Sequence, residues 1–376
     1  MKVGTQRIWN TPFTRTFNVR LPIVLPPMAG VSGGLLAAEV TRAGGLGMIA
    51  AGHFQDVSKL ETEIDIFLEN TKNNTNNMQK MKQEEQHPSE LNNNNNNLAI
   101  GFIGFSSLST STGWANYEHI LRTYTPGAVQ FFAPSISTRQ EDGKSNVQLA
   151  HDYGTKFIAQ VGTIDDVNEV MQHGVDAIIC QGREAGGHGI RPELGNSTMA
   201  LASQASNMTD IPILAAGGIV NGKHLASALC VCDGASIGTR YWASNESLGN
   251  KKLQQGLAST NTTCDDVIRT TVFDQIQNEL STNKWPHPYN SVGALRNQTT
   301  DEWEGKSTDE LQFAIDNTNL LEEYKVSQKR FNEKIIPTYA GEGVGEIDSI
   351  DSAYDITLRI EEEAICTMEK LKSIVS

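Results

Sequence analysis

One histidine lies in a segment whose composition suits catalysis. His188 follows Gly186 and Gly187 and precedes Gly189, in the segment Arg183-Glu184-Ala185-Gly186-Gly187-His188-Gly189. Because glycines have no side chains to compete for space, the imidazole would be the group nearest to a bound ligand. Histidine is the side chain most often used as a general base near neutral pH. A structural or solvated histidine is the alternative, and the flanking glycines favour a catalytic base.

Two other glycine-containing segments have the composition of phosphate-binding loops. They are Ala215-Ala216-Gly217-Gly218-Ile219 and Ile237-Gly238-Thr239-Arg240-Tyr241. Glycines allow backbone N–H groups to approach phosphate oxygens, and Thr239 adds a hydroxyl. Tight turns are the alternative. The sequence has neither a Gly-x-Gly-x-x-Gly fingerprint nor a P-loop lysine, which argues against a Rossmann or NTP-hydrolysing site.

A fourth segment, Leu25-Pro26-Pro27-Met28-Ala29-Gly30, combines rigid backbone with small side chains. A flat ring system could lie against such a surface, although this segment taken alone is better explained as a loop that needs Pro and Gly for its turn. Cys180 falls within an apolar run, so packing explains it better than a nucleophilic role does.

The elements that must position these residues follow from the pattern of apolar side chains. Short runs rich in Val, Ile and Ala alternate with helical periodicity, which is typical of a parallel sheet built from strand–helix units. Strands are predicted at 23–27, 46–51, 98–105, 128–133, 156–161, 177–181, 212–216 and 234–239. Helices are predicted at 35–43, 57–70, 115–124, 147–153, 165–173, 198–207, 223–230 and 251–259. Eight such units close a (β/α)8 TIM barrel, whose functional loops follow the C-terminal ends of the strands.

Two regions exceed the needs of a barrel. Residues 72–97 are too polar to bury and include an Asn run at 92–97, so a disordered surface insertion is predicted there. Residues 261–376 contain two helical stretches, 311–332 and 350–373, and are predicted to form a mainly helical addition that packs on the barrel mouth and walls a substrate cavity. The barrel would then span residues 1–260.

Composition restricts the partners. The net charge of −14 without a long basic run argues against nucleic acid or an anionic membrane as a partner. The five cysteines lack Cys-x-x-Cys spacing, so neither a disulfide framework nor a metal site is predicted. No apolar run is long enough for a transmembrane helix or a secretory signal, and prolines near the N-terminus oppose a mitochondrial leader. A cytoplasmic protein is expected.

The glycine-rich segments together resemble the nitronate monooxygenase family, formerly called 2-nitropropane dioxygenase. The resemblance covers roughly residues 8–260 and rests on Pro27-Met28-Ala29-Gly30, Gln181-Gly182-Arg183-Glu184-Ala185-Gly186-Gly187-His188-Gly189, Ala216-Gly217-Gly218 and Gly238-Thr239-Arg240. The segment Gly238-Thr239-Arg240-Tyr241-Trp242 is similar to that of fungal members.

This resemblance implies FMN as the cofactor. Its isoalloxazine ring would lie near Pro27, Met28, Ala29, Gln181 and Gly186, and its phosphate would bind at Gly217, Gly218, Ile219, Gly238, Thr239, Arg240 and Tyr241. His188 would face the substrate as the base. In the family the flavin takes one electron from an alkyl nitronate, O2 then adds, and a carbonyl compound and nitrite are released. Neutral nitroalkanes must first lose their α-proton to the base. The partners would be this small molecule and O2, with a homodimer left open.

The chain departs from bacterial members on the third strand, where Gly101-Phe102-Ile103-Gly104-Phe105 replaces a motif with a flavin-contacting Asn, so no contact is carried over there. Phe131 and Phe132, at the end of the fourth predicted strand, are predicted either to wall the substrate cavity or to pack in the core.

Other functions remain open from the sequence. The nearest is an NAD(P)H-dependent enoyl-thioester reductase of the same flavin barrel group, which has a similar Gly-Gly-His loop. The long C-terminal addition favours a closed cavity over one that admits a nicotinamide and an acyl carrier. The histidine disfavours a flavin-binding protein without turnover. A flavin-free lyase or isomerase would need Lys or paired carboxylates at the predicted strand ends, where both are scarce.

Overall fold

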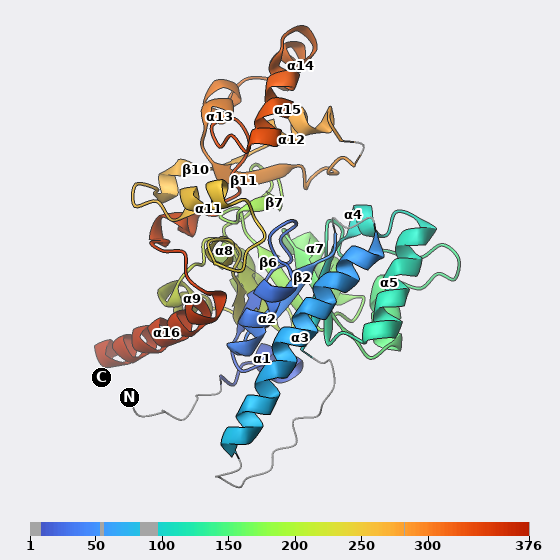
Figure 1. The fold of residues 1–376 in the computed structure, drawn as a ribbon, viewed down its shortest axis with the longest axis vertical. Coiled ribbons are helices and arrows are strands. Elements are labelled where there is room, and N and C mark those ends of the chain that lie inside the picture. The colour runs from blue at the N-terminus through green and yellow to red at the C-terminus, as the bar shows by residue number, and fades with distance from the viewer. Residues whose placement is uncertain (1–8, 53–55, 83–96, 282, 376) are drawn as a thin grey trace.

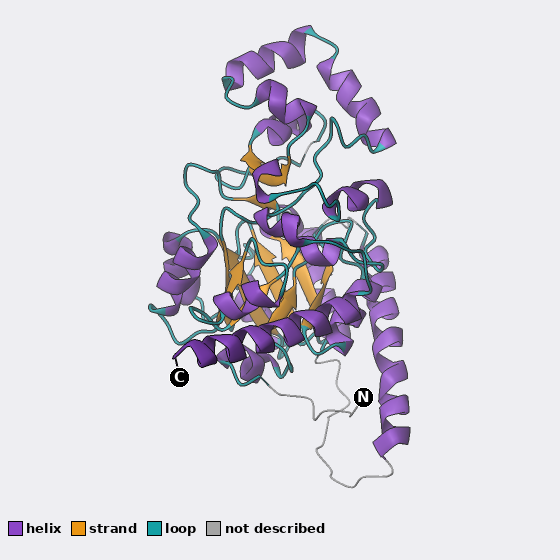
Figure 2. Cartoon of the chain, turned by 90° about the vertical axis from the view of Figure 1, so that its left-hand side faces the viewer, coloured by secondary structure: helices purple, strands orange, loops and turns teal. Residues whose placement is uncertain are grey.

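The computed structural model describes residues 9–52, 56–82, 97–281 and 283–375. Eight parallel strands form a closed barrel in the order β1-β2-β3-β4-β5-β6-β8-β9, so the predicted (β/α)8 fold is confirmed (Figures 1 and 2). The strands are β1 (Ile23–Leu25), β2 (Leu46–Ala50), β3 (Ala99–Ile103), β4 (Ala128–Phe132), β5 (Lys156–Val161), β6 (Ala177–Gln181), β8 (Ile213–Ala216) and β9 (Gly234–Ser236).

Apolar side chains fill the barrel at the N-terminal ends of its strands. Val24, Met48 and Ile158 point into this interior and are fully buried. Helix α1 (Pro12–Phe17), which is stabilised by a Thr11 capping box, adds Phe13 to the same cluster. This end of the barrel is therefore closed, and a ligand has access only at the C-terminal ends of the strands.

The helical ring follows the prediction over most of its length. Its members and short neighbours are α2 (Gly34–Arg42), α3 (Val57–Lys82), α4 (Gly104–Ser107), α5 (Ser111–Tyr124), α6 (Asn146–Asp152), α7 (Ile164–Met171), α8 (Thr198–Ser206) and α9 (Gly222–Ala228). The start of the predicted disordered insertion, residues 72–82, is helical instead, because extending an established helix gains a hydrogen bond per residue. Residues 83–96 of that insertion lie outside the described residues. None of the described helices is long and apolar enough to cross a membrane.

The last position of the ring is taken by an unexpected helix. The prediction placed residues 251–259 there, but α16 (Ala353–Val375) packs against α9 and α2 instead, and Figure 2 shows it lying across the barrel wall. Ile356 and Ile360 join the cluster that contains Leu225 of α9. The predicted helix exists as α11 (Lys251–Leu257), but Leu253 and Leu257 pack in a second core. Both helices have an apolar face, so local sequence does not decide which one completes the ring.

The remaining C-terminal residues form a layer beyond the C-terminal end of the barrel. Strands β10 (Val267–Thr270) and β11 (Ser291–Leu295) form an antiparallel sheet with β7 (Gly187–Gly189), which comes from the barrel segment after β6 (Figure 1). The sheet supports a second apolar core that includes Phe273, Trp303 and Tyr324. The other elements here are α10 (Thr239–Trp242), η1 (Cys264–Asp266), α12 (Val272–Asn278), α13 (Gln298–Trp303), α14 (Thr308–Asn317), α15 (Leu320–Arg330) and η2 (Glu342–Glu346).

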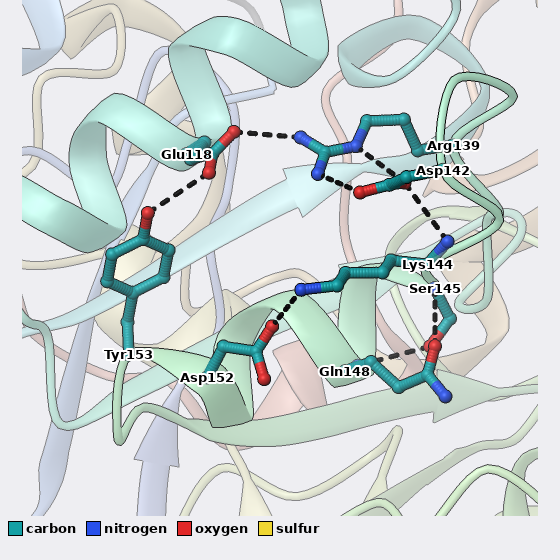
Figure 3. Close-up of polar contacts among 8 residues, drawn as sticks. All are labelled: Glu118, Arg139, Asp142, Lys144, Ser145, Gln148, Asp152 and Tyr153. Atoms are coloured by element: carbon teal, nitrogen blue, oxygen red, sulfur yellow. Dashed lines mark hydrogen bonds and ion pairs between the residues drawn. The ribbon is translucent and has the colours of Figure 1, made fainter.

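A polar network fastens the loop that follows β4 (Figure 3). The Arg139 guanidinium donates to Glu118 of α5 at 2.8 Å and also bonds Asp142, and the Tyr153 hydroxyl donates to Glu118 at 3.0 Å. The hydrogen bonds from Arg139 lower the pKa of Glu118, and lower that of Asp142 to about 2. The loop is thereby tied to the outer helices, which fixes the end of β4 at the barrel mouth.

Candidate active site

A cavity of about 380 Å³ lies at the C-terminal end of the barrel. Its wall includes these residues predicted from the sequence: Pro27, Met28, Ala29, Phe132, Gln181, Gly186, His188, Gly217, Gly218, Ile219, Gly238 and Thr239. The C-terminal layer contributes Trp285, Phe331 and Tyr339 to the same wall. The cavity is therefore enclosed jointly by the barrel and by the segment between β9 and α16.

Phe131 does not belong to this wall. It is fully buried on the outer face of β4, where its ring stacks on Phe157 with centroids 5.4 Å apart and on Phe102 with centroids 5.0 Å apart. Side chains of a strand alternate between its faces, so the neighbouring Phe132 points into the cavity. Of the two phenylalanines predicted to contact substrate, Phe131 is thus a core residue and Phe132 lines the cavity.

The side chains of Arg240 and Tyr241 also point away from the cavity. Arg240 Nη1 donates to the Ser349 carbonyl at 2.7 Å, and the Tyr241 hydroxyl bonds Thr357 of α16 at 2.8 Å. Both side chains therefore fix the C-terminal segment to the barrel. Any contact of these two residues with a phosphate would come from their backbone N–H groups, which have no helical partner in the first turn of α10.

His188 lies on a strand, where the sequence predicted a loop. Its backbone pairs with Val292 of β11, and its carbonyl accepts from Gln181 Nε2 at 2.9 Å. Gly187 has a φ of +70°, which few other residues adopt without strain. A Cβ at Gly186 would lie 2.7 Å from the backbone of Ala340. The glycines therefore allow the C-terminal layer to approach the histidine closely.

The His188 imidazole is held by a hydrogen bond at its edge and by an aromatic ring stacked on its face. Asp274 of α12, whose side chain is only 3% exposed, lies with Oδ1 3.0 Å from Nε2. Because an ionised carboxylate can only accept, Nε2 must carry the proton of this bond. The Trp285 indole stacks on the ring with centroids 3.9 Å apart and an interplanar angle of 10°. Among the described residues Nδ1 has no hydrogen-bond partner, so it is the ring nitrogen free to accept a proton.

A partly buried arginine holds the backbone in front of His188. Arg269 of β10 donates to the carbonyls of Arg183 at 3.0 Å, Ala185 at 2.6 Å and Gly187 at 3.4 Å. Burial lowers the pKa of Arg269 to about 10, against the attraction of nearby carboxylates that include Asp274. The guanidinium stays charged at neutral pH and fixes the segment between β6 and β7.

The two glycine-containing loops form a cradle of backbone amides. Gly217 and Gly218 have φ values of +129° and +70°, and their N–H groups have no acceptor among the described residues. A Cβ at Gly217 would lie 2.6 Å from Thr198 Oγ1. The Thr239 hydroxyl accepts from the Gly341 N–H at 3.0 Å, which joins this cradle to the C-terminal layer.

Several residues of this site were missed in the sequence. Asp274, Trp285 and Arg269 lie far along the chain from His188, and no local pattern connects them to it. Gln130 and Gln160 did carry a recognisable feature, because each is a polar residue within a largely buried strand.

Comparison with known proteins gives the same family along nearly the whole chain. The family model described as nitronate monooxygenase matches residues 10–357. A nitronate monooxygenase of Neurospora crassa is 25% identical over 94% of this chain and 92% of its own length. The nitronate monooxygenase npaC of Metarhizium robertsii is 27% identical over 91% of this chain and 90% of its own length.

Solved structures share the fold. Nitroalkane oxidase from Streptomyces ansochromogenes superposes with a TM-score of 0.69 and 21% identity, covering 95% of this chain and 99% of that one. FabK from Thermotoga maritima gives a TM-score of 0.68 and 23% identity, covering 97% and 99%. These neighbours show the fold, and the sequence match shows the family: the chain belongs to the nitronate monooxygenase family.

Proposed function

We propose that the protein is an FMN-dependent monooxygenase that uses O2 to oxidise alkyl nitronates, and neutral nitroalkanes after His188 has removed their α-proton, to carbonyl compounds and nitrite. The observation that carries this proposal is the arrangement of His188. One ring nitrogen is engaged by Asp274 and the other is free in a ligand-sized cavity.

The residues present fit a flavin mononucleotide. The free N–H groups of Gly217 and Gly218 and the first turn of α10 suit a phosphate, and a Cβ at Gly217 would be too close to Thr198. Pro27 and Met28 offer the flat, largely apolar surface on which a ring system would lie. When bound, the flavin would supply the redox chemistry, accepting electrons from the nitronate before O2 is consumed.

The proton step belongs to His188 and its neighbours. Nδ1 would take the α-proton of a neutral nitroalkane. Nε2 keeps its own proton and donates it in the hydrogen bond to Asp274, whose carboxylate stabilises the positive imidazolium that results. Trp285 covers one face of the ring and, together with Phe132, keeps water from the reacting carbon. A substrate that arrives already ionised needs no base.

The apolar part of the wall suits an alkyl chain. Phe132 packs edge-on against Tyr289 with centroids 5.2 Å apart and lies 6.0 Å from Trp285. Phe132 and Trp285 line the same cavity as His188, and their rings would bury the carbon atoms of the substrate.

One set of measurements tests the proposal. The purified protein should show a flavin absorption spectrum, and its flavin should react anaerobically with an alkyl nitronate. Reduction by NADH or NADPH without reaction with nitronate would overturn it in favour of an enoyl-thioester reductase.

His188→Asn should lower turnover of neutral nitroalkane by roughly 10²- to 10⁴-fold, the usual contribution of a general base, and should spare preformed nitronate. Equal losses on both substrates would show that His188 only binds or orients.

A further inference from the structure

Three glutamines form a continuous row of hydrogen bonds across the base of the cavity. Gln130 Nε2 donates to Gln160 Oε1 at 2.7 Å, and Gln160 Nε2 donates to Gln181 Oε1 at 3.1 Å. Gln181 Nε2 then donates to the His188 carbonyl at 2.9 Å. All three side chains line the cavity. The row therefore connects the bottom of the cavity to the backbone of His188, the candidate general base.

The stagger of the barrel explains why these side chains meet. Gln130 of β4 pairs with Ile158 of β5, two residues before Gln160. Gln160 pairs with Ile179 of β6, again two residues before Gln181. Each glutamine thus lies one inward-facing position further along its strand than the preceding one. The three amides climb with the strand tilt and follow one layer of the barrel interior.

The direction of every hydrogen bond in the row is determined by its last acceptor. The His188 carbonyl can only accept, so Gln181 must present its NH2 group there and its oxygen to Gln160. The same requirement passes to Gln160 and then to Gln130. Gln130 Oε1 is consequently left at the open end of the row as an acceptor. It is buried and has no partner among the described residues, and the whole residue is only 1% exposed.

We propose that this oxygen, Gln130 Oε1, accepts a hydrogen bond from a ring N–H of the bound cofactor. A buried acceptor without a partner is costly, and a ligand that donates to it regains that cost. The inference rests on the proposed function for the identity of the ligand. In an oxidised flavin the isoalloxazine ring carries one N–H group, at N3, so that group is the partner. Gln130 is then a cofactor-binding residue, and Gln160 and Gln181 are positioning residues that hold its polarity.

A flavin analogue tests this pairing without relying on turnover. The dissociation constants of FMN and of 3-methyl-FMN are measured by fluorescence titration of flavin-depleted protein. The wild type should bind the methylated analogue roughly 5- to 150-fold more weakly, the effect of leaving a buried acceptor unpaired. Gln130→Met and Gln130→Ala lack the acceptor, and the second also makes room for the methyl group. In both, the preference for FMN should fall toward equality.

Gln148→Met is the matched control. The Gln148 side chain also makes an amide hydrogen bond, accepting from the Ser145 N–H at 2.9 Å, but it lies at the start of α6, in the region of the Figure 3 network. This variant should keep the wild-type preference for FMN. A preference that survives in Gln130→Ala, or a wild type that binds both flavins equally, would overturn the inference and leave the proposed function intact. Failure to bind either flavin would overturn both.

Discussion

The carboxylate of Asp274 should matter for one class of substrate and not for the other. Replacing it by Asn keeps the size of the side chain and removes the charge that faces His188 Nε2 at 3.0 Å. A hydrogen bond to a charged group contributes about 1.5–3 kcal/mol. Each 1.36 kcal/mol changes a rate tenfold, so proton abstraction should slow by roughly 10- to 150-fold. This loss is smaller than that of His188→Asn, because the base itself remains.

The assay compares kcat/KM for a neutral nitroalkane and for its preformed nitronate. Asp274→Asn should show the full loss on the neutral substrate and little change on the nitronate, which has no proton to give. A nitroalkane deuterated at the α-carbon should also show a larger kinetic isotope effect in the variant, because proton removal becomes slower relative to later steps. Asp301→Asn, an exposed position on α13 of the same layer, is the control and should leave both substrates unaffected.

Two results would refute this reasoning. Equal losses on both substrates would mean that Asp274 supports the fold of α12 or the cofactor site and not the base. Unchanged turnover of the neutral substrate would mean that His188 does not need the carboxylate to hold its proton on Nε2.

Three further changes follow from the same geometry. Gly187→Ala should lower the free energy of unfolding by about 1–2 kcal/mol in a denaturant titration, because φ is +70°, and it should also impair flavin binding. The control Gly143→Ala, at a φ of +73°, should lower the free energy of unfolding by a similar amount and leave flavin binding unchanged. Arg269→Lys cannot reproduce the forked contacts to three carbonyls, so it should lower the melting temperature and turnover of both nitroalkane and nitronate together; a loss confined to nitroalkane would contradict this. Burial raises the pKa of Tyr339 to about 12, so above pH 10 the unfolded chain loses its tyrosine proton before the folded one does. The free energy of unfolding should therefore fall between pH 10 and 12, and less steeply in Tyr339→Phe.

The barrel was predictable because its signal is local. Most of the barrel strands are short, largely apolar runs, as in the Ala177–Gln181 strand. Parallel strands that are buried on both faces can be recognised from such runs without any alternation of polar and apolar residues. The eighth ring helix was not predictable in the same way. Residues 251–257 and 353–375 both carry an apolar face, and only the packing of Ile360 against the barrel shows which helix is used. The break between α14 and α15 was also missed.

The candidate site divides in the same way. The glycine-flanked His188 and the loop at Gly217 could be found because glycine is informative wherever a backbone approaches a ligand or another chain segment. The strand character of residues 187–189 could not, because two of its three residues are glycines with low strand propensity. The role of Asp274 could not be predicted for a different reason. Asp274 is brought close to His188 by the pairing of β7 with β11, which is a contact between distant parts of the chain.

The place of α16 in the ring has a consequence for how the protein folds during synthesis. The last barrel strand, β9, ends at Ser236, but α16, the helix that covers the junction between β9 and β1, begins at Ala353. Until that helix emerges from the ribosome, the apolar faces of α9 and α2 stay exposed to solvent and to other nascent chains. Contacts this distant in sequence also slow folding, since the intervening loop must be ordered first. The barrel is therefore vulnerable to aggregation for the whole time that residues 237–352 are being made, and chaperone dependence is expected to concentrate in that interval.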